Sequence, residues 1–337
     1  MKLNYKLLEN IINVDSPTGY SMNVCEYVEK YLNDLGYQTE RNKKGNIYVR
    51  VKGKSSYVKG ISAHLDTLGL MVRSINNDGT LHLTTIGGAL LNSYYAEYCK
   101  IYTRNNKIYT GTVLARSNAA HVHPDARTIE MNEDNMYVKL DEIVYNKEDT
   151  LKLGINTGDI IAINPKFEIT KSGYIKTRFL DDKASAFILL EVLRYIKENN
   201  IVPNDNLIFM FTTYEEVGHG ASFVPNMDEL LAVDMGCIGL DLNCNEEMVS
   251  ICAKDASGPY DYNMISKLVA LAKELKLNYC LDIYPKYSSD ASAALRGGAD
   301  IKCALIGPGI ANSHGMERTH KHALEDTFKL LISYLEL

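Results

Sequence analysis

The chain of 337 residues is long enough for one large domain or two unequal ones, and its 46% hydrophobic and 23% charged residues are typical of globular proteins. A net charge of -6 without a basic stripe argues against nucleic-acid binding. No apolar run approaches the roughly 20 residues that span a bilayer, so we expect no membrane association.

The N-terminal segment and the cysteines indicate the compartment. Residues 1–6 lack the apolar core of a signal peptide. The seven cysteines are scattered, odd in number and without a Cys-x-x-Cys pair. We therefore expect reduced, mainly buried thiols in a cytoplasmic protein.

Helical and extended patterns alternate at the beginning of the chain. Residues 4–35 are predicted to be helical, with an interruption at 16–19. Residues 45–51 and 57–63 have the apolar character of strands, and the second of these ends directly before His64.

From about 70 to 168 the chain changes to short alternating runs separated by turn residues, such as Asn77-Asp78-Gly79. Within this segment, a helical pattern of sufficient length is found only around residues 147–153. We predict a small β-barrel or sandwich, inserted into the first domain.

Alternation of strands and helices resumes near residue 178. This alternation favours an α/β fold whose mostly parallel sheet is covered on both faces. The expected helices are 183–197, 262–275, 290–296 and 323–336, and the expected strands lie near 206–212, 231–234, 248–253 and 301–306.

Acidic and histidine-bearing segments follow several of the predicted strands. In an open α/β sheet, sites form at the carboxyl ends of the strands. Five such segments are hard to explain as solvated loop charge. They are Ala63-His64-Leu65-Asp66, Leu180-Asp181-Asp182-Lys183, Tyr214-Glu215-Glu216-Val217-Gly218, Ala232-Val233-Asp234 and Ser313-His314-Gly315.

The chemistry of these side chains suits two divalent cations. Three carboxylates and a bridging hydroxide would neutralise the charge of two ions, and two neutral imidazoles would add ligands without charge. Mixed imidazole and carboxylate ligation favours zinc or cobalt, with manganese as an alternative, over calcium. The predicted ligands are His64, Asp181, Glu216, Asp234 and His314.

Two further residues are candidates for catalysis. Glu215, next to the ligand Glu216, is the natural general base for a water molecule. Because successive side chains of a strand point to opposite faces, both glutamates serve one site only if the strand ends there, and Gly218 fits such a bend. Asp66, two residues after His64, is placed to orient that imidazole.

Simpler explanations exist for single motifs. Asp181-Asp182 before a helix is a good N-terminal cap, and we give Asp182 a capping or supporting role. His320 competes with His314 as the last ligand, and Asp241 competes more weakly with Asp234. Only the complete set favours a metal centre over these explanations.

The motifs resemble those of the glutamyl or deblocking aminopeptidases, dinuclear metallopeptidases of the cytoplasm. The similarity extends over nearly the whole chain. It implies a three-layer zinc-peptidase α/β sandwich formed by residues 1–69 and 169–337, with an inserted β-barrel at 70–168 that helps subunits pack. The motifs that carry the resemblance are His64-Leu65-Asp66-Thr67-Leu68-Gly69-Leu70-Met71-Val72, Leu180-Asp181-Asp182-Lys183-Ala184, Tyr214-Glu215-Glu216-Val217-Gly218, Leu231-Ala232-Val233-Asp234 and Ser289-Asp290-Ala291.

The resemblance also assigns roles to residues. It makes Asp181 the bridging ligand and Glu215 the general base, and it suggests a cis peptide bond between Asp181 and Asp182. Two departures from the family pattern stand at Lys183, where arginine is common, and after His314, where Ser-Pro and then a glutamate are expected.

We therefore expect a metal-dependent aminopeptidase that removes N-terminal residues from short peptides. The family implies a homo-oligomer, a tetrahedral dodecamer built from dimers. A related metal-dependent deacylase or carboxypeptidase is the alternative within enzymes, because the same site attacks either amide. A non-catalytic, peptide-binding assembly scaffold is the alternative outside them, and the intact acid pair counts against it.

Overall fold

The computed structural model describes residues 2–337 and divides into two compact units. One unit combines the residues up to Thr67 with those from Lys166 onward, and the other is Leu68–Pro165. Leu68 and Gly69, assigned above to the first unit, lie in the second, and residues 166–168 belong to the first.

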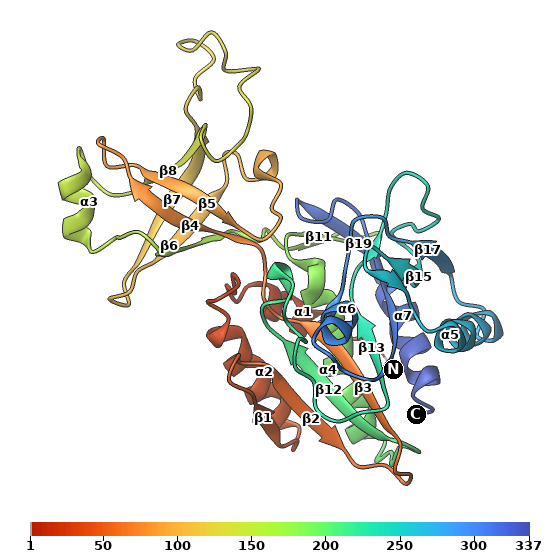
Figure 1. The fold of residues 1–337 in the computed structure, drawn as a ribbon. Helices are drawn as coiled ribbons and strands as arrows, with labels where there is room; N and C mark the ends of the chain where they lie inside the picture. Colours follow the sequence, from red (N-terminus) through yellow and green to blue (C-terminus); the bar gives the residue numbers. More distant parts are fainter. Residues whose placement is uncertain (1) are drawn as a thin grey trace. The chain divides into compact units, whose positions relative to one another are not determined.

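A mixed sheet forms the centre of the first unit (Figure 1). Its described strands, in spatial order, are β1 (Thr39–Arg41), β2 (Ile47–Val51), β12 (Asn206–Thr212), β3 (Val58–His64), β13 (Glu229–Val233), β18 (Lys302–Ile310), β15 (Val249–Asp255) and β16 (Gly258–Pro259), with β14 (Gly236–Cys237) beside β18 and β17 (Tyr279–Ile283) beside β15. The strands β12, β3, β13 and β18 run parallel, whereas β2 and β15 continue the sheet in antiparallel pairing. These central strands are almost entirely buried, which explains their nearly unbroken apolar sequences.

Helices pack against this sheet and against one another. They are α1 (Tyr5–Ile12), α2 (Met22–Asp34), α4 (Leu180–Glu198), α5 (Tyr262–Glu274), α6 (Asp290–Arg296) and α7 (Lys321–Tyr334). The helix α4 is buried along most of its length because it contacts β3, α1 and α7. Within residues 2–337, no helix has both the length and the apolar character needed to cross a bilayer. The predicted α/β class is confirmed, with a mixed sheet in which the four central strands are parallel and β17 also pairs in parallel with β15.

A small sheet that the sequence did not predict connects two distant segments. It consists of β10 (Glu168–Ile169), β11 (Tyr174–Thr177) and β19 (Glu317–His320), in that order. In its register Thr177 lies opposite Glu317. The pairing therefore brings the segment before α4 next to the segment that contains His314.

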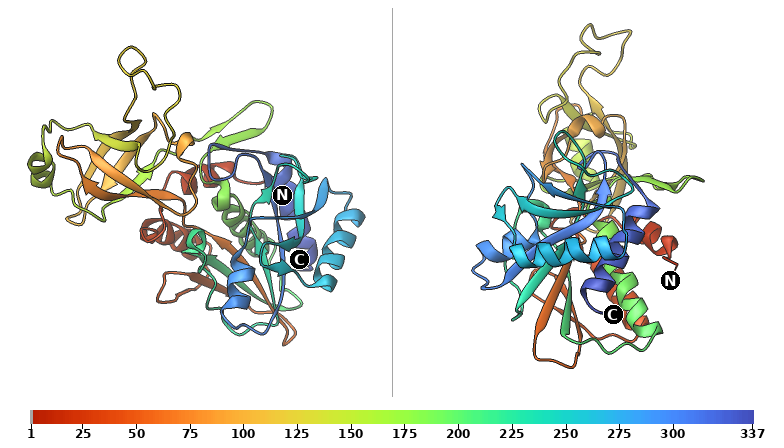
Figure 2. Two further views of the ribbon diagram at one scale, coloured as in Figure 1. Left: turned by 45° about the horizontal axis from the view of Figure 1, so that its top comes forward. Right: turned by 90° about the vertical axis from the view of Figure 1, so that its right-hand side faces the viewer.

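The second unit is a closed β-barrel (Figure 2). Its described strands are β4 (Gly69–Ile75), β5 (Leu81–Ile86), β8 (Met136–Leu140), β7 (Ile108–Ala115), β6 (Tyr98–Tyr102) and β9 (Ile160–Ile163) in spatial order. Buried residues alternate along β7 at Gly111, Val113 and Ala115, which is the two-residue period of a strand with one face toward a core. The helix α3 (Lys147–Leu153) and the short turn η1 (Leu91–Ser93) complete the unit. The expected barrel and its short helix are both present.

Candidate metal centre

Neighbouring parallel strands end at one edge of the central sheet. In the register of β12 and β3, Thr212 lies opposite His64, and β13 lies on the other side of β3. The acidic residues that follow β12 and β13 therefore meet His64 at this edge, as expected for the carboxyl ends of parallel strands.

His64 is buried among these acids. Its Nδ1 lies 2.9 Å from the backbone oxygen of Asp66, while its Nε2 lies 3.1 Å from Asp181 Oδ1 and 3.8 Å from Glu215 Oε2. Burial acts to lower the pKa of His64, but Asp181 and the other carboxylates outweigh it and raise that pKa. The position of Nε2 thus favours a positive charge, which a proton or a metal ion supplies.

The side chain of Asp66 contacts the segment that begins with Glu215. It contacts the His64 ring through its backbone oxygen, with the carboxylate farther away at 3.7 Å. The carboxylate instead accepts hydrogen bonds from the Thr18 hydroxyl at 2.6 Å and from the backbone N–H of Glu215 at 3.2 Å. Asp66 therefore orients Glu215 as well as His64.

The two aspartates at the start of α4 point to different neighbours. The peptide bond between them is cis, as expected from the resemblance. Asp181 contacts both histidines, since its Oδ1 faces His64 and its Oδ2 lies 3.6 Å from His314 Nε2. Asp182 Oδ2 accepts the backbone N–H of His64 at 3.2 Å, so Asp182 supports His64 and does not simply cap the helix.

Glu215 and Glu216 lie just beyond the end of β12. This is the position in which both side chains can serve one site. The strand ends at Thr212, and the 3-10 turn η2 (Glu215–Val217) follows. Burial and neighbouring carboxylates raise the pKa of both glutamates. Glu216 Oε2 lies 3.8 Å from His314 Nε2, and within residues 2–337 its buried Oε1 has no hydrogen-bond partner.

Asp234 follows β13 and is buried, whereas Asp241 lies in an exposed turn. Asp234 Oδ1 accepts its neighbour's N–H, that of Met235, at 2.5 Å. Burial and then Asp181 raise the pKa of Asp234 to about 7. The structure thus puts Asp234, and not Asp241, with the other acids.

His314 and His320 lie in different surroundings. The imidazole of His314 faces Asp181 and Glu216. His320 Nε2 lies 2.8 Å from the backbone oxygen of Ser172, and its Nδ1 accepts the N–H of His322, which caps the start of α7. Only His314 of these two therefore joins the acidic edge.

Two supporting residues were given no role from the sequence. Glu317 is buried, and its two oxygens accept the backbone N–H groups of Asp181 at 3.1 Å and of His314 at 3.2 Å. Asp290 accepts the Thr212 hydroxyl and, at 2.8 Å, the backbone N–H of Ala221. The only local signal for Asp290 is its place in the Ser289-Asp290-Ala291 motif. Glu317 stands three residues after His314, where the family pattern expects a glutamate, although the residues between them differ from that pattern.

This arrangement fits divalent cations. Three groups of described side chains have possible ligand atoms within 4.8 Å of one another. Two belong to this edge, His64 with Asp181 and Glu216 and His64 with Asp182 and Asp234, and the third, Glu247 with His320 and His322, contains none of these residues. The buried carboxylates raise one another's pKa because no positive charge compensates them. In addition, Glu216 Oε1 is buried and accepts no hydrogen bond among the described residues. A cation bound to these oxygens would satisfy both needs.

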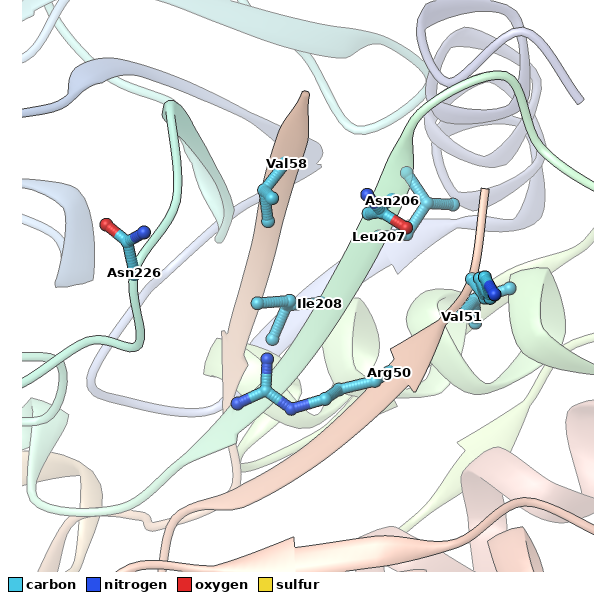
Figure 3. A pocket seen from close by; sticks show the side chains of 8 residues that line it. Arg50, Val51, Val58, Asn206, Leu207, Ile208 and Asn226 are labelled. Atoms are coloured by element: carbon cyan, nitrogen blue, oxygen red, sulfur yellow. The ribbon is translucent and has the colours of Figure 1, made fainter. Parts of the chain in front are cut away.

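A pocket of about 300 Å³ lies at the opposite ends of the same strands (Figure 3). Arg50 and Val51 near the end of β2, Val58 at the beginning of β3 and Asn206 at the beginning of β12 contribute to its walls. It contains none of the predicted ligands, so the candidate site remains the acidic edge.

A family model and a similar protein sequence both match this chain over most of its length. Residues 45–330 match the model of the M42 glutamyl aminopeptidases. The Bacillus subtilis (strain 168) protein named "Putative aminopeptidase YhfE" is 45% identical over 334 residues, which cover 98% of this chain and 96% of that protein.

Two solved structures share the fold over nearly the full length. The TET aminopeptidase of a marine sediment archaeon, Thaumarchaeota archaeon SCGC AB-539-E09, superposes with a TM-score of 0.89 at 19% identity and covers 98% of this chain and 96% of that one. The TET1 peptidase of Pyrococcus horikoshii, described as able to assemble into a tetrahedron or a large octahedral shell, has a TM-score of 0.87 at 22% identity and covers 98% of each chain.

Proposed function

Because the chain belongs to the family of M42 glutamyl aminopeptidases and is thus a metal-dependent peptidase, we propose that it is a two-metal aminopeptidase acting on short peptides. The observation that carries the finer proposal is the meeting of His64, Asp181 and Glu216 with Asp234 and His314 at one sheet edge. The expected ions are zinc or cobalt, with manganese as an alternative.

Asp181 is proposed as the ligand that both ions share. Its two oxygens face different histidines, His64 and His314, which supports a bridging role. Asp234 would complete the ligands on the His64 side, and Glu216 would complete those on the His314 side. Asp182 would hold the backbone of His64 in place.

Glu215 is proposed as the general base. When bound, two cations polarise the scissile carbonyl and lower the pKa of the attacking water. Glu215 would accept a proton from that water as its oxygen bonds to the carbonyl carbon, and would then give the proton to the leaving amine as the C–N bond breaks. The hydrogen bond from the Glu215 N–H to Asp66 supports this role because it fixes the backbone of the base.

A homo-oligomeric state is part of the proposal. The tetrahedron described for the Pyrococcus horikoshii TET1 peptidase supports a tetrahedral assembly, and the family resemblance suggests that it is a dodecamer built from dimers. A hollow cage would admit short or unfolded chains and exclude folded proteins. A cytoplasmic location is proposed on the cysteine content.

A panel of aminoacyl amides of every side-chain class, assayed with zinc, cobalt and manganese in turn, tests the function. We expect release of the N-terminal residue, with activity lost after chelation and restored by one of the ions. Cleavage of N-acylated or C-terminal substrates in place of free-amine substrates would favour the deacylase or carboxypeptidase. Substoichiometric metal after gentle purification, together with no hydrolysis, would favour the scaffold.

A further inference from the structure

Tyr287 reaches the acidic edge but has no part in the mechanism above. It lies between β17 and α6, and its hydroxyl is buried although the residue as a whole is half-buried. Among the described residues the hydroxyl makes no hydrogen bond of normal geometry, although Asp234 is close enough to interact with it as an acceptor. A buried hydroxyl that is bonded only weakly is costly, so a substrate atom beside it would be a favourable partner.

The hydroxyl of Tyr287 lies beside Asp234, whose carboxylate is within reach of a hydrogen bond, and the charges of Asp181 and Glu215 also act on it. A tyrosine hydroxyl is protonated at neutral pH. The side chain therefore presents a neutral hydrogen-bond donor among groups that accept.

The segment that carries Tyr287 is fixed to β15. The backbone oxygen of Tyr287 accepts the N–H of Ala256 at 2.8 Å, and the N–H of Tyr284 donates to the backbone oxygen of Lys254 at 2.9 Å. The Tyr284 hydroxyl lies 2.5 Å from Ser250 Oγ, and the rings of Tyr284 and Tyr287 pack edge to face at 5.3 Å. The donor is thus held in place before a substrate arrives, which is the arrangement that stabilises developing charge most effectively.

We propose that Tyr287 is a further catalytic residue, whose hydroxyl donates a hydrogen bond to the carbonyl oxygen of the scissile bond as that oxygen becomes negative. The inference rests on the proposed aminopeptidase function. As the water oxygen bonds to the carbonyl carbon, the carbonyl π electron pair moves onto the carbonyl oxygen. The Tyr287 hydroxyl donates a hydrogen bond to that oxygen. The electron pair returns when the C–N bond breaks, and Tyr287 keeps its proton throughout.

The Tyr287→Phe variant removes this donor and keeps the ring packing. Removal of one donor to an oxyanion typically costs about 10²–10³ in rate, so we expect kcat to fall by that factor while KM changes little. A phosphinic pseudodipeptide, which imitates the tetrahedral carbon, should bind more weakly by a similar factor, whereas the product amino acid should bind unchanged. Metal content and thermal unfolding should match the parent. Tyr262→Phe, at an 82% exposed position, is the matched control and should behave as the parent throughout.

Several results would overturn the inference. If the parent is active and Tyr287→Phe keeps its kcat, Tyr287 has no catalytic role and the proposed function still stands. If Tyr287→Phe loses metal together with activity, the residue positions Asp234 and does not act on the substrate. If the metal-loaded parent hydrolyses no aminoacyl amide, the proposed function and the inference both fail.

Discussion

The two adjacent glutamates illustrate how surroundings divide roles between identical side chains. Glu215 is oriented by Asp66 through its backbone N–H and faces His64. Glu216 has one oxygen near His314 and another without a hydrogen-bond partner among residues 2–337. These contacts favour proton transfer at Glu215 and metal binding at Glu216.

Glu215→Gln should therefore reduce activity without releasing metal. An amide has the same shape as a carboxylic acid but does not accept the proton of the attacking water, and general base catalysis typically contributes roughly 10²–10⁴-fold. We expect kcat to fall by about that factor, with normal metal content measured by mass spectrometry of digested protein. Glu216→Gln is the paired variant and should lose metal. Retention of most activity by Glu215→Gln would remove its assignment as the base.

Substitutions at His314 and His320 should have different effects, the first on metal binding and the second on the free energy of unfolding. His314→Ala removes a side chain that faces Asp181 and Glu216, so we expect it to lose about one metal ion per chain and nearly all activity. His320→Ala removes the cap of α7, which typically costs about 1 kcal/mol, and should keep both ions. Metal analysis combined with urea unfolding distinguishes the two, and the opposite pattern would move the site to His320.

Glu317 should matter for the geometry of the site although it lies outside the proposed ligands. Its carboxylate accepts the backbone N–H groups of Asp181 and His314, and a buried group left without its partner typically costs about 1–3 kcal/mol. Glu317→Ala should therefore lower both the free energy of unfolding and the affinity for metal. The exposed Glu274→Ala is the control. Equal metal affinity in the two variants would show that Glu317 does not position the ligands.

Among the strands, the close approach of β18 to the end of β13 depends on one glycine. A Cβ at Gly307 would lie 1.4 Å from the backbone oxygen of Asp234, a clash that no rotation of a side chain relieves. Gly307→Ala should move Asp234, destabilise the fold by about 1–3 kcal/mol or more, and weaken metal binding. Gly239→Ala, with open space around its Cβ, should do neither. Denaturant unfolding and metal titration of both variants provide the measurement, and a Gly307→Ala protein with normal metal binding would contradict the argument.

Local sequence signals predicted the elements that deliver ligands but not those that support them. The apolar run of β12 followed by Glu215, and the strand ending at His64, are both visible within about ten residues. Tyr287 and Glu317 have partners that are far away along the chain, Asp234 and Asp181 respectively, so these contacts are not indicated by a local pattern. The strands β10, β11 and β19 have only two to four residues each, and their pairing depends on contacts between distant segments.

The molecule as a whole is predicted to assemble. Twelve chains of 37.7 kDa would give a particle of about 450 kDa, formed by closed symmetric association of identical interfaces. Light scattering at several protein concentrations and metal loads should show this mass when metal is saturating. A dimer that persists at saturating metal would rule out the cage while leaving the chemistry of each site untouched.

The closed barrel has a practical consequence for protein engineering. Each of its described strands pairs on both sides, so the register of the barrel is set without the long loop that joins β7 to β8. The tip of that loop, around His121 and Asp125, is exposed. Exposed loop tips of this kind tolerate inserted sequence. A fluorescent reporter or affinity peptide placed there would label the protein while leaving both chain ends in their native form.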